Sequence, residues 1–391
     1  MKIDAVDFFY LSMPEVLDIG DGSQDALLVR IRAGGFEGWG ECEASPLTSI
    51  ASYVCPMSHS ACKPIKYALQ GMSIDSVKDI HCISSLVHKN SSDLLQADHT
   101  LSGIDIALWD ILGKKLNEPV YKLLGYKKAY PKIPYASQLF GATPEETFEK
   151  AKKAKASDFK AVKFGWGQFG KNSLKDDIAH LLAAREGVGE STHLMIDAGT
   201  VWEENVAVAQ ERLTPLNKIN AYWLEEPFIN GALKAYKSLS ESDPKVALAG
   251  GEGCNNFVQA QAMIDYAGLK FIQIDSGRIG GITVAKRVAD LAHHKNISYV
   301  NHTFTSHLAL SASLQPFAGI EKDIFSEYPV ELKSLAKDIS KIKIIPDSNG
   351  YIHVPEQPGL GIPVDSQALK KYLVDVEIKV NGKQIYYTPE L

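Results

Sequence analysis

The sequence lacks the segments that mark membrane and exported proteins. None of its apolar runs approaches the roughly 20 residues that a helix needs to span a bilayer. Asp4 and Asp7 stand near the N-terminus, where a signal peptide would be apolar. We therefore expect a cytoplasmic protein with no membrane partner.

Long basic runs are missing as well. The chain has 41 Lys and Arg against 47 Asp and Glu, for a formal net charge of −6. Lys150, Lys152, Lys153 and Lys155 stand close together within a stretch of helical spacing, which predicts a solvated helix face rather than a binding stripe. We expect no nucleic-acid partner.

Cysteine is scarce, and its spacing fits no zinc pattern. The odd number of cysteines in a chain of 391 residues favours reduced, structural thiols over a disulfide framework. One of them lies two residues after a candidate metal ligand, and packing is a better interpretation of it than catalysis. The five are Cys42, Cys55, Cys62, Cys82 and Cys254.

The composition itself is that of an ordinary globular protein, with 45% apolar and 23% charged residues. A length of 391 residues exceeds what one hydrophobic core usually serves, so we expect two domains. Residues 1–130 mix short elements, among them a strand at 26–31 and an amphipathic helix at 105–112. Pro131 and Pro134 then mark a break.

From residue 131 to about 355 a different rhythm follows, in which short apolar runs alternate with amphipathic stretches. Eight such units in roughly 200 residues predict a (β/α)8 barrel of parallel strands. A doubly wound sheet is the alternative, but no Gly-rich phosphate loop follows an early strand. The runs are 133–136, 161–164, 193–196, 221–224, 246–249, 271–274 and 297–300, with a weaker eighth near 324–325.

An ionisable residue stands near the end of, or just after, each of six consecutive runs. In a barrel of this type the carboxyl ends of all strands point into one mouth, where the chemistry is done. Polar residues that merely begin loops would explain one or two of these positions, but six in register favour a shared pocket. The six are Lys163, Asp197, Glu225, Glu252, Asp275 and His302.

Three of these residues are candidate metal ligands. Asp197, Glu225 and Glu252 would repel one another unless a cation neutralised them. Oxygen ligands without His or Cys favour a hard ion such as Mg²⁺ over Zn²⁺. The alternative for Glu225 and its neighbour Glu226 is a surface pair at a helix start.

His302 and Asp275 are the best candidates for a general base and its partner. The pKa of histidine lies near neutral pH, and a carboxylate can orient the ring and raise its basicity. A hydrogen-bonded core histidine is the alternative for His302 alone, but the partner one strand earlier argues against it. His307 is the nearest competitor, and we interpret it as a loop or helix-start residue.

Taken together, these motifs resemble the mandelate racemase subgroup of the enolase superfamily. The resemblance is carried by residues 102–110 (SGIDIALWD), Gly113 and Lys114, the three segments with the metal candidates, and residues 275–281 (DSGRIGG). It implies a modified barrel at 131–355 beneath an α+β capping domain formed by residues 1–130 and a returning segment at 356–391. It also implies one Mg²⁺ per subunit, removal of the proton α to a carboxylate, and a homo-oligomer.

The resemblance assigns further roles. The family's ligand is the first acid of its Glu-Glu-Pro segment, hence Glu225. Lys163 matches the first lysine of the family's Lys-x-Lys pair, and Gly165 stands where the second, often the opposing base, is expected; a register shifted by two would make Lys163 the second. Glu327 matches a glutamate that can hydrogen-bond the substrate carboxylate, although a surface acid is the alternative.

A single base fits elimination better than racemisation, because a racemase takes a proton from one face of a carbon and returns it to the other. The leading hypothesis is a carbon–oxygen lyase, a dehydratase that acts on a small-molecule sugar acid. His302 would take the C2 proton, and the product would be a 2-keto-3-deoxy acid. A cycloisomerase that opens an anhydro ring, a racemase or epimerase, and an inactive sugar-acid-binding protein are the alternatives.

Specificity should lie in the cap. Residues 13–23 and 45–63 are candidate lids, which would exclude water and select the substrate. Trp166 and Phe169, just past the second barrel strand, are candidate pocket residues, with packing as the equal alternative.

Overall fold

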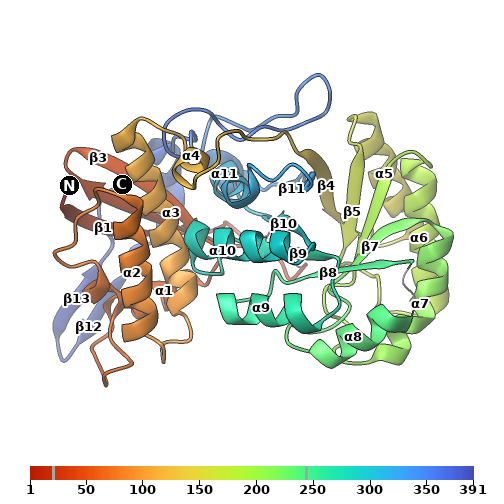
Figure 1. Ribbon diagram of the computed structural model, residues 1–391, viewed down its shortest axis with the longest axis horizontal. Helices are drawn as coiled ribbons and strands as arrows, with labels where there is room; N and C mark the ends of the chain where they lie inside the picture. Colours follow the sequence, from red (N-terminus) through yellow and green to blue (C-terminus); the bar gives the residue numbers. More distant parts are fainter. Residues whose placement is uncertain (20–22, 243–244) are drawn as a thin grey trace.

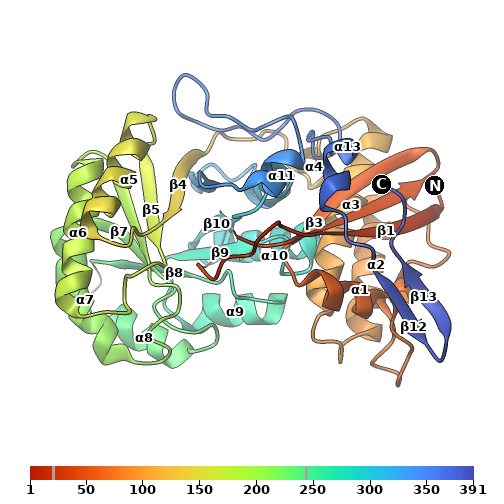
Figure 2. The ribbon, with the colours of Figure 1, turned by 180° about the vertical axis from the view of Figure 1, so that it is seen from behind.

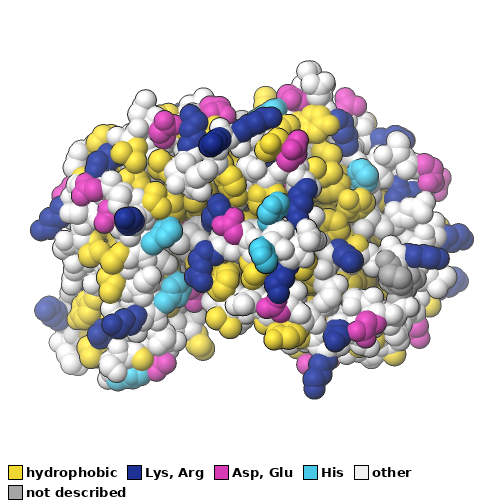
Figure 3. All heavy atoms as spheres, viewed as in Figure 1, with side chains coloured by type: hydrophobic (Ala, Val, Ile, Leu, Met, Phe, Trp, Pro, Cys, Tyr) yellow, Lys and Arg dark blue, Asp and Glu magenta, His cyan; other side chains and the backbone are white. Residues whose placement is uncertain are grey.

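A computed structural model describes residues 1–19, 23–242 and 245–391. It has two lobes, a mixed cap and a barrel, and both ends of the chain lie in the cap (Figure 1). No helix of the described ranges is long and apolar enough to cross a membrane. On the face in Figure 3, basic side chains are interspersed with acidic ones and form no continuous stripe.

The cap is built on an antiparallel three-stranded sheet against which helix α3 packs. Gly38 and Gly40 let the helix approach the last strand, since a Cβ atom at either position would lie 2.3 Å or less from a backbone oxygen of α3. The elements are β1 (Ile3–Leu11), β2 (Ala26–Ala33), β3 (Phe36–Cys42), α1 (Pro46–Val54), η1 (Ile65–Ala68), α2 (Val77–Asn90), α3 (Ala97–Leu116) and α4 (Val120–Leu123).

The end of the chain returns to this sheet. The amide of Val374 donates to the carbonyl oxygen of Tyr10 (2.9 Å), and the hydroxyl of Tyr386 donates to that of Phe8 (2.7 Å). Figure 2 shows the hairpin of the last two strands beside the cap. The elements of this segment are α13 (Ser366–Leu369), η3 (Lys370–Tyr372), β12 (Glu377–Val380) and β13 (Lys383–Tyr387).

The second lobe is an eight-stranded parallel sheet that curls into a nearly closed barrel, with the strands in the order β10-β9-β8-β7-β6-β5-β4-β11. A helix follows each strand. The strands are β4 (Ile133–Leu139), β5 (Ala161–Gly165), β6 (His193–Asp197), β7 (Ala221–Glu225), β8 (Ala247–Gly250), β9 (Phe271–Asp275), β10 (Ser298–His302) and β11 (Phe325–Pro329). The helices are α5 (Pro144–Ala156), α6 (Leu174–Val188), α7 (Val206–Lys218), α8 (Leu233–Ser242), α9 (Phe257–Tyr266), α10 (Gly281–His294), α11 (His307–Leu314), η2 (Gln315–Phe317) and α12 (Ser334–Asp338).

Side chains join the two edge strands of the barrel, β10 and β11. The amide of Glu327 donates to Oδ1 of Asn301 (3.0 Å), and the amide of Thr303 donates to Oε2 of Glu327 (2.8 Å). These two hydrogen bonds therefore hold Glu327 beside the end of the strand that carries His302.

The predicted barrel beneath an α+β cap is confirmed, and all eight predicted runs fall on strands. The lysine-rich stretch forms α5, where Lys152, Lys153 and Lys155 are exposed as expected. Helices α8 and α9 were not identified from the sequence. In α8 only Ala235, Tyr236 and Leu239 are buried, so its apolar stripe is too sparse to stand out.

Polar residues of the motif at 102–110 join α3 to its surroundings. Asp105 accepts hydrogen bonds from the amide (2.9 Å) and hydroxyl (2.5 Å) of Thr283, in the first turn of α10. Asp110 accepts from the amides of Trp39 (2.9 Å) and Leu360 (2.8 Å), so one carboxylate ties the helix to β3 and to the returning segment. Burial raises the pKa of Asp105 to about 7, although Thr283 opposes the shift.

Replacing Asp110 by alanine should destabilise the fold by about 2–4 kcal/mol, because two buried amides lose their acceptor. The matched control is Asp290→Ala, which removes an exposed carboxylate paired with Lys286 and should cost less than about 0.5 kcal/mol. Urea unfolding followed by circular dichroism measures both. Equal losses in the two variants would contradict the anchoring role of Asp110.

Candidate active site

The predicted site residues meet at the carboxyl ends of the barrel strands. A narrow pocket of about 240 Å³ is lined there by residues from five of these strands and from the loops after β5 and β10. Lys163, Asp197, His302 and Glu327 line this pocket together. All four are buried, with 0–4% of their surface exposed, so the surface alternative for Glu327 is wrong.

His302 and Asp275 form the predicted dyad. They are paired in register at the ends of adjacent strands β10 and β9, and Nδ1 of His302 lies 2.7 Å from Oδ2 of Asp275. A carboxylate at Nδ1 favours the tautomer that carries its proton there, which leaves the Nε2 lone pair facing the strand ends. Nε2 lies 3.2 Å from Oε2 of Glu252 and 3.8 Å from Oε2 of Glu327.

Lys163 lies among carboxylates on the other side of the pocket. Its ammonium is 2.5 Å from Oε1 of Glu225, 2.8 Å from Oε1 of Glu327 and 3.8 Å from Oδ2 of Asp197. Burial alone would lower the pKa of Lys163, but Glu225 and Glu327 raise it well above its ordinary value. In this arrangement Lys163 is a fixed cation and hydrogen-bond donor rather than a proton acceptor.

Each of the three predicted metal ligands also has a protein partner. Oδ1 of Asp197 accepts from the amide of Gly199 (2.7 Å), and Oε2 of Glu225 accepts from Nε1 of Trp223 (2.9 Å). Oε1 of Glu252 lies 3.6 Å from a guanidinium nitrogen of Arg278. As these side chains stand, no three His, Cys, Asp or Glu residues of the described chain form a group ready to hold a metal. The ligand assignment therefore stays a prediction.

The chemistry of this cluster nevertheless fits a hard divalent cation. Burial and then the charge of Glu225 raise the pKa of Asp197 well above its ordinary value, although Lys163 opposes the shift. The donors are carboxylate oxygens without sulfur or imidazole in the predicted trio, which is the ligand type that Mg²⁺ prefers. Asp197, Glu225 and Glu252 would hold it, at the ends of β6 and β7 and just after β8.

Gly165 closes one side of the pocket. It is in register with Asp197 on the neighbouring strand, and a Cβ at this position would lie 2.5 Å from Oδ2 of Asp197. A side chain here would therefore displace a predicted metal ligand. The absence of a second lysine thus has a local steric reason.

Comparisons with known proteins agree with this geometry. Residues 146–368 match the family described as enolase C-terminal domain-like. Residues 12–125 match the mandelate racemase/muconate lactonizing enzyme N-terminal domain. The chain belongs to the mandelate racemase subgroup of the enolase superfamily.

The proteins that are similar to this chain are named after several different reactions. A crystal structure described as a predicted mandelate racemase from Rhodobacter sphaeroides is 55% identical, covers 99% of each chain and has a TM-score of 0.95. The arabinonate dehydratase of Saccharolobus solfataricus is 29% identical over 70% of this chain and 71% of its own. The N-succinyl-L-Arg/Lys racemase of Bacillus cereus is 26% identical over 97% of this chain and 100% of its own. Others are named as cycloisomerases.

Of the remaining candidates, His307, Phe169 and Cys254 have structural roles, and Trp166 belongs to the pocket. His307 begins α11, as expected, and accepts from the amide of Ile344 (3.2 Å), while burial lowers its pKa to about 4. Phe169 is fully buried and stacks on Phe140, whereas Trp166 lines the site pocket. Burial raises the pKa of the Cys254 thiol, in keeping with packing.

Sequence analysis missed several residues that hold the site. The hydroxyl of Ser137 donates to Oε1 of Glu327 (2.8 Å) from the end of the first barrel strand. Trp223 stands two residues before Glu225 on the same face of β7, a period-2 relation that was available as a signal. No such spacing in the sequence pointed to the contact of Arg278 with Glu252, because that contact depends on how two loops meet.

The doublet of Glu225 and Glu226 provides a test of the metal assignment. Both are buried, so the surface-pair alternative is wrong. Burial and the charge of Glu225 raise the pKa of Glu226. Glu225→Gln should weaken Mg²⁺ binding at least about tenfold, and the matched Glu226→Gln change should weaken it less. Titration calorimetry with MgCl₂ measures both; a larger loss in the Glu226 variant would overturn the assignment.

Gly165→Ala should also weaken Mg²⁺ binding by about tenfold or more, because the added methyl group pushes on the Asp197 carboxylate. A matched control is Gly71→Ala in the cap, where no atom lies within 4 Å of the added methyl but the backbone is likewise unusual (φ +77). Titration calorimetry with MgCl₂ measures the affinity of both variants. Unchanged affinity in the Gly165 variant would show that the carboxylate is not held where the steric argument places it.

Proposed function

We propose that this protein is a lyase that removes the C2 proton of a sugar acid and expels the C3 oxygen, giving a 2-keto-3-deoxy acid. The observation that carries the proposal is the asymmetry of the pocket. One side has His302, oriented by Asp275, and the other has the fixed ammonium of Lys163 with no room for a side chain at Gly165. Sugar-acid dehydratases among the relatives support it.

Magnesium bound by Asp197, Glu225 and Glu252 would polarise the substrate carboxylate and so make the neighbouring proton more acidic. Lys163 and Glu327 flank the same region, and their 2.8 Å ion pair keeps both in place. Lys163 supplies a positive charge and, beside the two N–H groups that Glu225 and Glu327 engage, one further N–H donor for the negative charge that develops on the substrate carboxylate. Ser137 and the amide of Thr303 hold the Glu327 side chain from two strands.

His302 carries the proton through the reaction. Its Nε2 takes the proton from C2, and the electron pair of that C–H bond forms the enolate. As the enolate collapses, the C2–C3 double bond forms and the C3–O bond breaks. The imidazolium then donates its proton to the departing oxygen, which leaves as water, and the enol product tautomerises to the 2-keto acid. Asp275 stabilises the imidazolium between the two transfers.

A ring-opening cycloisomerase is the second candidate. If the C3 oxygen belongs to an anhydro ring, the same two proton transfers by His302 open the ring without releasing water. A crystal structure of a 3,6-anhydro-D-galactonate cycloisomerase from Zobellia galactanivorans, 27% identical with a TM-score of 0.82, supports this candidate. Racemisation is less favoured, because it needs a proton carrier on the face where Lys163 is held.

The deciding experiment is a screen of aldonates and anhydro-aldonates with Mg²⁺ in D₂O, read out for 2-keto acids. We expect at least one acid to give a 2-keto-3-deoxy product. In the His302→Asn variant we expect the rate to fall by about 10³-fold or more, because the only imidazole among the described residues of the pocket is lost. Mg²⁺ affinity should fall far less.

Exchange of the C2 hydrogen for deuterium with no 2-keto acid would refute elimination and favour a racemase. Binding of sugar acids with neither exchange nor product would favour an inactive binding protein. His294→Asn is a suitable control for the histidine variant, because His294 lies at the exposed end of α10. An unaffected rate in His302→Asn would exclude His302 as the base.

A further inference from the structure

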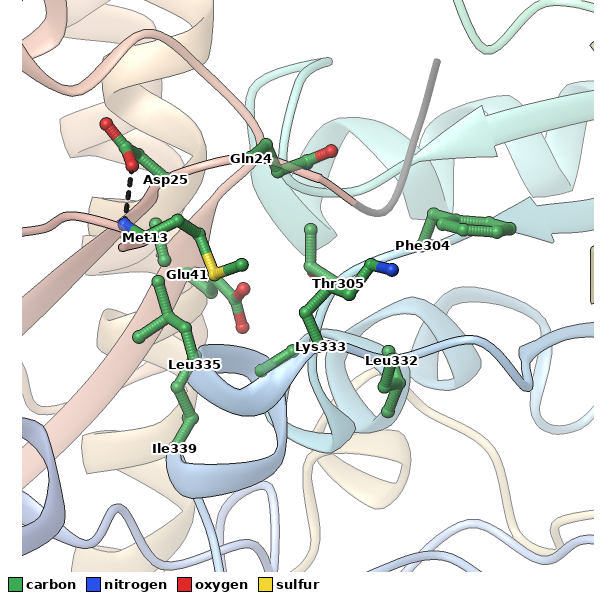
Figure 4. Close-up of a pocket in the computed structure, with 12 residues that line it drawn as sticks. Met13, Gln24, Asp25, Glu41, Phe304, Thr305, Leu332, Lys333, Leu335 and Ile339 are labelled. Carbon is green, nitrogen blue, oxygen red and sulfur yellow. Dashed lines mark hydrogen bonds between the residues drawn. The ribbon is translucent and has the colours of Figure 1, made fainter. Parts of the chain in front are cut away.

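A second pocket lies beside the first, between the cap and the loops at the mouth of the barrel. Its lining residues are drawn in Figure 4, and the space among them, with the solvent at its mouth included, is about 330 Å³. Its walls come from Met13 of the candidate lid, from residues 24–26 beyond that lid, from the segment after His302, and from residues 332–339 after β11. Phe304 lines both this pocket and the site pocket, so the two are neighbours. Anything bound at His302 that extends past Phe304 would enter it.

Glu41, on cap strand β3, directs its carboxylate into this second pocket (Figure 4). Only 2% of its surface is exposed. The hydroxyl of Ser306 donates to its Oε2, and the hydroxyl of Thr305 is near enough to lower its pKa, whereas Oε1 has no hydrogen-bond partner of good geometry in the described part of the chain. A buried carboxylate oxygen without a donor costs free energy, and such groups are few in folded proteins. Oε1 of Glu41 is therefore placed to accept a hydrogen bond from a bound ligand.

The other charged residues that line this pocket are less suited to bind a ligand. Both oxygens of Asp25 are already engaged, by the hydroxyl of Tyr10 (2.6 Å) and the amide of Met13 (2.7 Å). Lys333 is exposed, so water and salt weaken its pull on a ligand. A charge interacts more strongly when it is removed from water, so Glu41 should dominate the electrostatics inside the pocket.

We infer that Glu41 is a specificity-determining residue that accepts a hydrogen bond from a hydroxyl at the distal end of the substrate. The same carboxylate disfavours acids with a second carboxylate at that end. The substrate class is then the monocarboxylic aldonates rather than the dicarboxylic aldarates. This inference rests on the proposed function, in that it takes the substrate to be a sugar acid.

Two matched pairs of probes test it, D-gluconate with D-glucarate and D-galactonate with galactarate, because the members of each pair differ only at C6. The quantity is the ratio of kcat/KM for the aldonate to that for the aldarate, with Mg²⁺ present. We expect the wild-type protein to prefer the aldonate and Glu41→Gln to reduce that preference by about tenfold or more. Glu37→Gln removes an exposed charge from the same strand and should leave the ratio unchanged.

The ratio should also depend on pH. Burial raises the pKa of Glu41 to about 7, against the opposing effect of the hydroxyls of Ser306 and Thr305, while Glu43 and Asp275 add to the shift. The carboxyl is therefore charged above pH 7 and neutral below it. The wild-type preference for the aldonate should grow between pH 6 and pH 8.5 and stay flat in Glu41→Gln, because ionisations that act on both acids cancel in the ratio.

Measuring the binding of these acids without turnover tests the role of Glu41 independently of the proposed lyase activity. Titration calorimetry of the same four acids against the Mg²⁺-loaded His302→Asn protein, with and without Glu41→Gln, gives the preference without turnover. If no acid is converted but Glu41→Gln still narrows the binding ratio, the proposed lyase fails and the role of Glu41 stands. A wild-type preference for aldarates, equal losses for both members of each pair, or no binding of any acid would overturn that role.

Discussion

Four carboxylates, those of Asp197, Glu225, Glu252 and Glu327, are gathered at one end of the barrel, and each is at most 5% exposed. Parallel strands impose this arrangement, because their carboxyl ends all open into the same mouth. Away from water, each like-charge contact raises the free energy of the folded state. The rest of the site consists largely of groups that offset this repulsion: the ammonium of Lys163, the guanidinium of Arg278 and donors such as the indole N–H of Trp223.

The same constraint explains which positions near the mouth can carry a side chain. Gly165 lies against the carboxylate of Asp197, so the space for a second base is filled by a predicted metal ligand. Lys163, two residues earlier on the same strand face, points the same way but is held by Glu225 and Glu327. A cation that balances buried carboxylates is poorly placed to act as a base, since giving up its proton would leave that negative charge uncompensated.

Much of this could be predicted from the sequence, for a clear reason. Strand ends are local features: each apolar run and the polar residue after it lie within a few positions, so the residues from Lys163 to His302 were found one by one. The Lys163–Glu225 contact joins strands β5 and β7, which are not neighbours in the sheet, and depends on the barrel's curvature and on side-chain length. The pocket at Glu41 depends on how the cap docks, and β3 alone gives no sign of it.

The cap motif at 102–110 shows a further limit. Its polar residues resemble a chemical signature, yet Ser102 accepts from the amide of Gly280, Asp105 bonds Thr283, and Asp110 bonds the amides of Trp39 and Leu360. Each contact attaches the cap helix to a neighbouring segment, and two of the three hold the turn that follows Asp275. The motif therefore marks the docking of the cap, and its link to catalysis runs through the position of that turn.

Reaction class then has to be argued from the pocket rather than from the fold. Relatives named as dehydratases, cycloisomerases and a racemase share this family, and the structure that is 55% identical is itself described only as a predicted mandelate racemase. What separates a racemase from the two eliminating enzymes is whether a proton carrier stands on each face of the substrate carbon. In the proposed arrangement one face has an oriented imidazole, and the other has an ammonium committed to two carboxylates beside a glycine whose Cβ would press on Asp197. A site with one proton carrier can return the proton only to the side from which it came, and the departing oxygen of an elimination can be on that side.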